Sequence, residues 1–145
     1  MGSKIGVIPG ENLILTYVTL GVYDLKRSLE FYRDGLGWQP QSSQGFHYLQ
    51  MGSVRVALYP MSDLTRDAGM LTEARPAGTN CRGVALAVNV PDQDQVDPLL
   101  SKAEKFGGQV MRRGEYKSWG GYVGFFLDPD NNLWEVAWNP TLTFG

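Results

Sequence analysis

The chain has little of the chemistry that crosslinks and metal sites require. It contains one cysteine, Cys81, and one histidine, His47. A single cysteine excludes an internal disulfide, and it cannot anchor a zinc site without nitrogen or oxygen ligands elsewhere in the chain. No apolar run approaches the roughly 18 to 20 residues that a membrane-spanning helix requires, and the first residues do not resemble a signal peptide. We therefore expect a cytoplasmic protein that contacts no membrane.

An excess of charge of one sign is also missing. The 13 basic and 15 acidic residues give a formal net charge of -2, and no block of lysine or arginine occurs. This excludes the basic patch of a typical nucleic-acid-binding protein and favours a small or apolar ligand. The length of 145 residues and the hydrophobic content of 43% are typical of one soluble globular domain.

The pattern of apolar residues predicts where this domain begins. Residues 1–12 contain several glycines and are interpreted as an N-terminal arm, whereas residues 13–145 form a single domain. Alternation from Leu13 to Val22 predicts a strand. Asp24 then offers an N-cap for an amphipathic helix over residues 25–34, which ends at the following glycines.

Two further strands, Phe46–Met51 and Val54–Tyr59, are predicted around a tight turn at Gly52-Ser53. Such a turn places Leu49 opposite Val56. One face of the hairpin is then aliphatic, and the opposite face is aromatic and polar. We expect the aliphatic face to pack on the helix and the aromatic face to line something else.

The pattern then restarts, because Val84–Val88 matches Val18–Val22. Each segment precedes a helix that ends at glycine and leads into further strands. We interpret the chain as two βαβββ units, at about residues 13–60 and 82–139, joined by a linker at about 61–81. The second helix is expected to have Asp97 as its N-cap and Pro98 as its first residue.

The second unit is predicted to end in a strand at residues 109–112, a loop at 113–120 and a hairpin over residues 120–140. A cluster of Asp, Pro and Asn forms the turn of this hairpin, between runs rich in aromatic residues and valine. Glu135 lies in the second strand of the hairpin. A carboxylate among apolar neighbours is costly to bury unless it is paired, so Glu135 is the first candidate for a functional residue.

With these elements in place, the sequence resembles the vicinal oxygen chelate superfamily, which includes lactoylglutathione lyases, extradiol dioxygenases and bleomycin-resistance proteins. The signature of the first unit is VTLGVYDLKRSLEFY at residues 18–32 with GLGW at 35–38, and that of the closing hairpin is LDPDNNLWEV at residues 127–136. The fold that the resemblance implies is α+β, with two tandem βαβββ units whose sheets curl around a shared cleft and whose helices lie outside. It says little about function, because one scaffold hosts unrelated activities.

The resemblance also implies where a metal would bind. Metal enzymes of the superfamily commonly place ligands at positions that correspond here to Tyr17, Ala57, Gly83 and Glu135. Only Glu135 is a good ligand, whereas a divalent metal needs three or more N, O or S donors. His47 falls on the aliphatic face of the first hairpin and is interpreted as a structural or surface histidine. We therefore predict neither a metal nor another cofactor.

Without a metal, the shared cleft is predicted to bind a small organic ligand that is mostly apolar or aromatic. The predicted ligand-binding residues are aromatic, hydroxyl-bearing or charged: Tyr17, Thr19, Phe46, Tyr48, Arg55, Tyr59, Trp119, Phe125 and Glu135. Trp119, beside two glycines that leave the backbone free to move, is either a lid on the cleft or a plug between the units. Arg55 either pairs with Glu135, meets an anionic ligand or is exposed at the strand edge.

Three roles remain open for Glu135. It is a remnant of a lost metal site held by the Tyr17 and Tyr48 hydroxyls, a general base, or a contact to a cationic or hydroxylated ligand. The favoured function is metal-independent binding of a small molecule, as in the drug-binding resistance proteins that the sequence resembles. One alternative is a lyase or isomerase, with Glu135 as the only catalytic candidate or with a metal on non-standard ligands. Another is a structural or regulatory dimer module whose aromatic residues fill the cleft, and the resemblance itself implies a homodimer.

Overall fold

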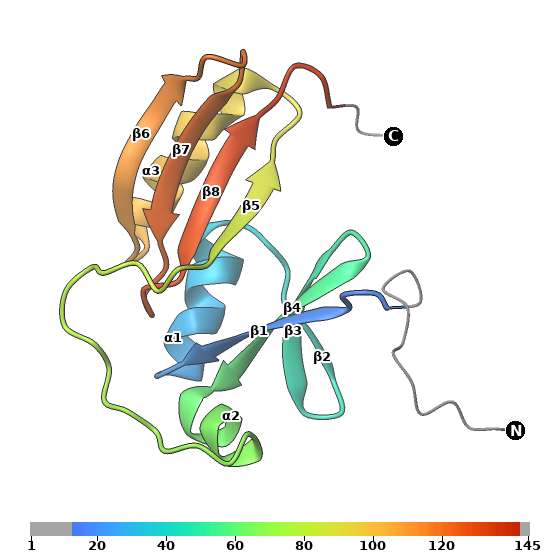
Figure 1. Ribbon diagram of the computed structural model, residues 1–145, viewed down its shortest axis with the longest axis vertical. Coiled ribbons are helices and arrows are strands. Elements are labelled where there is room, and N and C mark those ends of the chain that lie inside the picture. Colours follow the sequence, from blue (N-terminus) through green and yellow to red (C-terminus); the bar gives the residue numbers. More distant parts are fainter. Residues whose placement is uncertain (1–12, 143–145) are drawn as a thin grey trace, which may run out of the picture.

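The computed structural model describes residues 13–142, whose elements form two successive units (Figure 1). The first unit comprises β1 (Tyr17–Val22), α1 (Leu25–Glu30) with its π-helical continuation η2 (Phe31–Gly35), β2 (Gln41–Ser43), β3 (Phe46–Met51) and β4 (Val54–Pro60). The second comprises β5 (Ala85–Asn89), the 3-10 turn η3 (Gln93–Gln95), α3 (Val96–Lys105), β6 (Gln109–Tyr116), β7 (Tyr122–Leu127) and β8 (Leu133–Trp138). Between them, α2 (Met61–Asp67) opens the connecting segment. The arm expected at residues 1–12 lies outside the described residues.

Each unit builds one four-stranded sheet, and the two sheets have the same topology. Sheet A has the strand order β1-β4-β3-β2 and sheet B the order β5-β8-β7-β6. In both sheets the first strand of the unit runs parallel to the last, whereas the remaining pairs are antiparallel. The α+β fold of two tandem βαβββ units is therefore confirmed.

The register of the first hairpin agrees with the prediction. Leu49 lies opposite Val56, and Met51 lies opposite Val54 across the turn at Gly52. Gly52 has a φ of 61°, which glycine adopts without the steric penalty of a side chain. Because side chains alternate along a strand, this register assigns every residue of β3 and β4 to one face of sheet A.

One face of each sheet packs into a common apolar core. Figure 1 shows α3 against one face of sheet B and α1 between the two sheets. The core takes side chains from α1, α3 and both sheets: Leu20, Val22, Phe31, Tyr32, Leu36, Leu49, Val56, Leu58, Val96, Leu100, Ala103, Phe126, Trp134 and Val136. Burial of each large side chain stabilises the fold by about 1.5 to 3 kcal/mol, so the two units are held together mainly here.

The opposite face of each sheet is its open face. In sheet A, α2 covers only one end of this face, where Met61 and Leu64 pack closely on Gly21. A Cβ at Gly21 would lie 2.6 Å from the Met61 sulfur, so the close packing of α2 requires glycine at this position. None of the helices between residues 13 and 142 is long and apolar enough to cross a membrane.

The helices α1 and α3 differ from the prediction at their ends. The α-helix α1 stops at Glu30 and continues as a π-helical turn to Gly35. The helix of the second unit, α3, begins at Val96 rather than Pro98, after a 3-10 turn in which the Asp92 N–H donates to Gln95 Oε1 at 3.0 Å. Pro98 is tolerated at the third helical position because the first four N–H groups of a helix have no intrahelical acceptor.

The strand after α3 is longer than predicted. β6 continues from Arg112 to Tyr116, across register shifts on both sides of Arg112. Such bulges interrupt the alternation by which a strand is detected in a sequence. Gly114 allows the bulged strand to pass the Tyr122 ring, since a Cβ there would lie 2.3 Å from a ring carbon.

Candidate functional site

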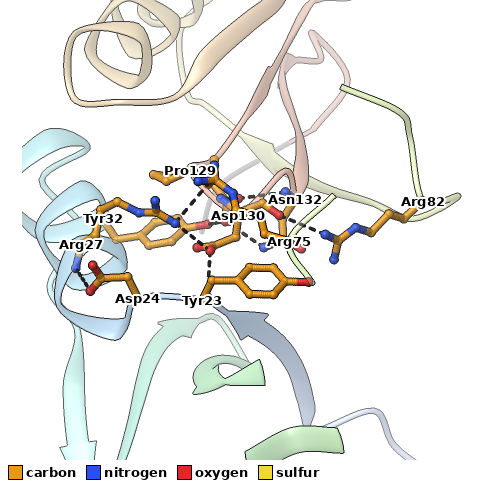
Figure 2. Close-up of polar contacts among 10 residues, drawn as sticks. Tyr23, Asp24, Arg27, Tyr32, Arg75, Arg82, Pro129, Asp130 and Asn132 are labelled. Atoms are coloured by element: carbon orange, nitrogen blue, oxygen red, sulfur yellow. Dashed lines mark hydrogen bonds and ion pairs between the residues drawn. The ribbon is translucent and has the colours of Figure 1, made fainter. Parts of the chain in front are cut away.

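The turn between β7 and β8 joins the two units through polar contacts (Figure 2). The Tyr23 N–H and Arg27 Nη2 both donate to Asp130 Oδ1, each at 2.9 Å. The Tyr32 hydroxyl donates to Asp128 Oδ2 at 2.5 Å and accepts from Trp134 Nε1 at 3.0 Å. These contacts fasten a loop of the second unit to the start and the end of the first helix.

Both carboxylates of this turn are buried. Asp128 Oδ1 accepts the N–H groups of Asp130 at 2.9 Å and Asn132 at 2.8 Å, so the Asp128 side chain organises the turn itself. Burial raises the pKa of Asp130, and burial together with the nearby Asp128 raises the pKa of Tyr32 well above its usual range. From the connecting segment, Arg75 and Arg82 donate to the carbonyls of Pro129 and Asp130. The closing signature of the sequence is thus a structural junction.

A separate cavity lies on the open face of sheet A. It has a volume of about 500 Å³ and draws its lining from all four strands of sheet A, from α2 and from the turn after β2. Five predicted ligand-binding residues line it, namely Tyr17, Thr19, Phe46, Arg55 and Tyr59. The remaining lining residues are Ser43, Gln44, Ala57, Leu64 and Asp67.

Aromatic rings form the walls of this cavity and a small residue forms its floor. The Phe46 and Tyr59 rings lie 5.4 Å apart between centroids. Tyr17 and Phe46 remain 45% and 46% exposed, although aromatic residues elsewhere in the chain fill the core. Ala57 lies between Thr19 of β1 and Tyr48 of β3, and its methyl group leaves the space above it open.

Arg55 supplies the positive charge of the cavity. Its guanidinium carbon lies 4.3 Å from the centroid of the Tyr48 ring, which is itself buried. Nη1 donates to the Tyr17 hydroxyl at 2.9 Å, and Nε donates to Gln50 Oε1 at 3.1 Å. The stacking and the two hydrogen bonds to neutral groups hold the guanidinium in place, and no carboxylate among residues 13–142 pairs with its charge.

The far end of the cavity carries a negative charge. The Tyr59 hydroxyl donates to Asp67 Oδ2 at 2.8 Å, and this hydrogen bond raises the pKa of Tyr59. Asp67 comes from α2, in the segment interpreted as a linker, and sequence reasoning missed it. The only signal in the sequence was the short apolar pattern of that helix, which does not reveal that the helix folds back over sheet A.

The other predicted residues do not join this cavity within one chain. Glu135 lies half-buried on the open face of sheet B, between Ala87 and Phe125 in neighbouring strands. Its side chain has no hydrogen bond or ion pair with residues 13–142, so the expected pairing with Arg55 is not formed within the chain. The hydroxyls expected to hold it are engaged elsewhere: that of Tyr17 with Arg55 and that of Tyr48 with Gln41 at 3.2 Å.

Phe125 and Trp119 are also separate from the cavity. Phe125 lines a smaller hollow of about 280 Å³ on sheet B, together with Cys81 and Met111. The Trp119 ring folds back on Gly121 of its own turn, where a Cβ would lie 2.0 Å from the ring, and the side chain is 54% exposed. Trp119 is therefore neither a lid over the cavity in sheet A nor a plug in the core.

The residues at the expected metal positions do not fit a metal. Tyr17 and Ala57 belong to sheet A, Glu135 belongs to sheet B, and Gly83 has no side-chain donor. In the described part of the chain, no three His, Cys, Asp or Glu side chains gather in a way that could hold an ion. His47 pairs with Leu58 on the face of sheet A that packs into the core.

Two further grooves of similar size lie outside this cavity. They have volumes of about 570 and 580 Å³ and share Trp38, Val90 and Leu99. The first is lined by amide and aliphatic side chains, and the charges of the second belong to Asp92, Asp94 and Lys102. Neither combines several aromatic walls with a charged side chain that has only neutral partners in the described part of the chain, so the cavity in sheet A is the stronger candidate.

The family model and the most similar solved structures agree on the family of this chain. Residues 14–136 match the model of the glyoxalase/bleomycin resistance protein/dioxygenase superfamily. A glyoxalase-related enzyme from Fulvimarina pelagi is 33% identical, with a TM-score of 0.79 over 91% of this chain and 92% of that one. A hypothetical protein from S. aureus is 23% identical, with a TM-score of 0.74 over 92% and 96% of the two chains.

A lactoylglutathione lyase from Agrobacterium tumefaciens shares the fold at 21% identity, with a TM-score of 0.63 over 91% of this chain and 98% of that one. No curated protein gives a significant sequence match. The family match covers both units, including the first-helix and closing-hairpin segments that meet at the junction. The chain therefore belongs to the glyoxalase/bleomycin resistance protein/dioxygenase superfamily.

Proposed function

We propose that the chain binds a small organic molecule in the cavity on the open face of sheet A, without a metal. The observation that carries the proposal is the gathering of five aromatic, hydroxyl-bearing or charged residues from three strands around about 500 Å³ of space. This volume lies in the range of ordinary small-ligand sites. Two of the aromatic rings stay exposed to the cavity, where a ligand would cover them.

The lining suits a ligand with an apolar ring and a few polar groups. Phe46 and Tyr59 offer ring faces and edges, and burial of apolar area against them stabilises a complex by about 25 cal/mol per Å². Thr19, Arg55 and Asp67 supply polar contacts that would fix the orientation of the ligand. Among the described residues that line the cavity, no serine or threonine hydroxyl is hydrogen-bonded to a base, so binding is favoured over turnover.

We further propose that the chain is a homodimer. Several apolar side chains are exposed outside the cavity, including Val84 at 65% and Met111 on sheet B. A second copy that covers them would remove this apolar area from water. Size-exclusion chromatography with light scattering at micromolar concentration is expected to give twice the mass of 16.1 kDa for the chain. A monomer mass under these conditions would contradict this part of the proposal.

The test of binding uses native mass spectrometry and ligand-observed NMR. Protein purified without chelator is expected to carry no stoichiometric metal and to bind apolar or aromatic fragments. Ala57→Leu fills the floor of the cavity and is expected to abolish fragment binding while the protein stays folded. Ala85→Leu makes the same change on the open face of sheet B and is expected to leave binding intact.

Two outcomes would contradict the proposal. Fragment binding that survives Ala57→Leu would place the site elsewhere. More than about half an equivalent of tightly bound metal would show that donors other than those at the expected positions form a metal centre.

A further inference from the structure

We infer that the ligand of the sheet A cavity is an aromatic carboxylate whose anionic group binds Arg55. This rests on the proposed function and specifies the chemical class of the ligand. In the described part of the chain, Arg55 differs from the other arginines in its partners. Apart from Arg55, each of them reaches a carboxylate or a backbone carbonyl: Arg27 and Asp130, Arg33 and Asp34, Arg66 and Asp63, Arg75 and Pro129, Arg82 and Asp130, Arg112 and Glu115, Arg113 and Glu104.

Arg55 instead has only neutral partners among residues 13–142. Tyr17 and Gln50 take one hydrogen bond each, and the Tyr48 ring lies under the guanidinium. These contacts fix the plane of the guanidinium without neutralising it. A guanidinium held in this way presents its remaining N–H groups as a rigid fork, which matches the two oxygens of a carboxylate.

The negative charge within the cavity cannot serve as this partner. Asp67 is bound to Tyr59, and Tyr59 lies four residues beyond Arg55 on the same face of β4. At about 3.3 Å per residue, this separates the backbone positions of Arg55 and Tyr59 by roughly 13 Å. An anion beside Arg55 must therefore come from outside this group of residues.

The wall between the two charges determines the rest of the ligand. Phe46 and Tyr59 present tilted rings, and Ala57 leaves room above the sheet between them and Arg55. A flat aromatic ring fills such a space with offset or edge-to-face contacts. A carboxylate on that ring would meet the guanidinium in charge-assisted hydrogen bonds, which are roughly twice as strong as those between neutral groups.

The test compares three probes that share a ring system and differ in charge: naphthoate, naphthamide and naphthylmethylammonium. Dissociation constants measured by NMR titration are expected to be at least about tenfold lower for naphthoate than for naphthamide, with the ammonium weakest. Arg55→Met is expected to raise the naphthoate constant to that of the amide and to leave the amide constant unchanged. Arg55→Lys keeps the charge without the fork and is expected to be intermediate.

The matched control is Arg113→Met, which removes an arginine bound to Glu104 on the far side of sheet B. It is expected to leave all three dissociation constants unchanged. Equal binding of the three probes, lost in Ala57→Leu, would overturn the inference and leave the proposed function standing. A neutral fragment that occupies the cavity while naphthoate does not would have the same meaning.

Two further results would overturn the inference in different ways. If no compound binds the cavity, the proposed function is overturned together with it. If Arg55→Met changes the mass of the assembly and not the affinity for naphthoate, the guanidinium serves a contact between copies of the chain and binds no carboxylate ligand. Circular dichroism of each variant shows whether its fold is intact.

Discussion

The two units of the chain share a topology and differ at the centre of their open faces. In sheet A, Ala57 lies between Thr19 and Tyr48, and in sheet B the corresponding Glu135 lies between Ala87 and Phe125. The small residue leaves room for a cavity, whereas the carboxylate occupies that room in the other sheet. The buried faces must fit one common core, whereas the open faces carry no such requirement and differ in their central residues.

The two central hairpins of the units differ as well. The turn between β3 and β4 is formed by Gly52 and Ser53 and is exposed to solvent. The turn between β7 and β8 spans Asp128–Asn132 and carries two carboxylates, which are only 2% and 1% exposed. The second turn makes hydrogen bonds to the other unit through Asp128 and Asp130. Equivalent turns in the two units therefore have different roles: the first only reverses the chain, and the second forms the junction between the units.

The largest expected loss of stability comes from a substitution at the junction between the units. Asp128→Ala takes away the acceptor of the Tyr32 hydroxyl and of two N–H groups in the turn. Because these donors are buried or partly buried, we expect the free energy of unfolding to fall by about 3 to 4 kcal/mol. Urea unfolding followed by tryptophan fluorescence measures it. Ser53→Ala in the other turn is the control, with an expected change within about 0.5 kcal/mol.

A smaller loss is expected when the Tyr32 hydroxyl, one of the contacts between the units, is removed. Tyr32→Phe keeps the ring in the core but leaves the buried Trp134 N–H without its acceptor. The expected loss of unfolding free energy is about 1 to 3 kcal/mol by the same measurement. Tyr116→Phe, which removes an exposed hydroxyl bound to Gln93, should change little. Equal effects of the two substitutions would mean that the buried hydrogen bond adds no stability.

Ala57→Glu removes the main difference between the two open faces, because it gives sheet A the central residue of sheet B. Arg55 lies two residues away on the same face of β4, about 7 Å along the strand, so the new carboxylate reaches its guanidinium. We expect naphthoate affinity to fall by more than about tenfold. Ala57→Gln adds nearly the same volume without the charge, and a loss as large as that of the glutamate variant would show that volume alone decides binding.

Much of this fold was predictable because it depends on local pattern. The Gly52-Ser53 turn with alternating residues on both sides set the register of β3 and β4, and the repeat of Val18–Val22 at Val84–Val88 revealed the second unit. The misplaced boundaries have local causes that periodicity hides. Bulges on both sides of Arg112 mask half of β6, and a 3-10 turn before Val96 lets the helix start ahead of Pro98.

The candidate site was only half predictable. Alternation correctly placed Tyr17, Thr19, Phe46, Arg55 and Tyr59 on one face, because face assignment within a sheet follows from strand register. It cannot say how two sheets sit relative to each other, so Glu135 and Phe125 were assigned to a cleft that a single chain does not form. Asp67 was missed because its position depends on α2 folding back over β1 and β4.

The buried Asp130 at the junction also makes the stability of the fold depend on pH. Burial raises the pKa of Asp130 in the folded state and the charge of Asp128 adds to this effect, against the opposing effects of the Tyr23 N–H, Arg27 and Arg75. The folded protein therefore holds this proton more tightly than the unfolded chain, and the resulting stability is present at low pH and lost as the pH rises through the folded-state pKa. Stability relative to Asp130→Asn should thus increase on acidification from neutral pH.

The control for this titration has the opposite sign. Arg33 lowers the pKa of the exposed Asp34, so that contribution is lost as the pH falls. Wild type should therefore lose stability relative to Asp34→Asn on acidification, with a weaker slope because solvent screens an exposed pair. Urea unfolding at a series of pH values measures both slopes. A slope for Asp130 of the same sign as that for Asp34 would contradict the assignment.

The smallest effect on stability and binding is expected at Glu135, the first candidate for a functional residue in the sequence. Its side chain is half-buried and has no hydrogen bond or ion pair within the described chain, so Glu135→Ala removes no contact that holds the fold. We expect the free energy of unfolding to change by less than about 0.5 kcal/mol and naphthoate affinity to stay the same. A clear loss of affinity, measured by the same NMR titration, would mean that sheet B of one copy completes the cavity in sheet A of another. The difference between the two open faces would then be a complementarity across the dimer, with Glu135 acting on a ligand that its own chain does not hold.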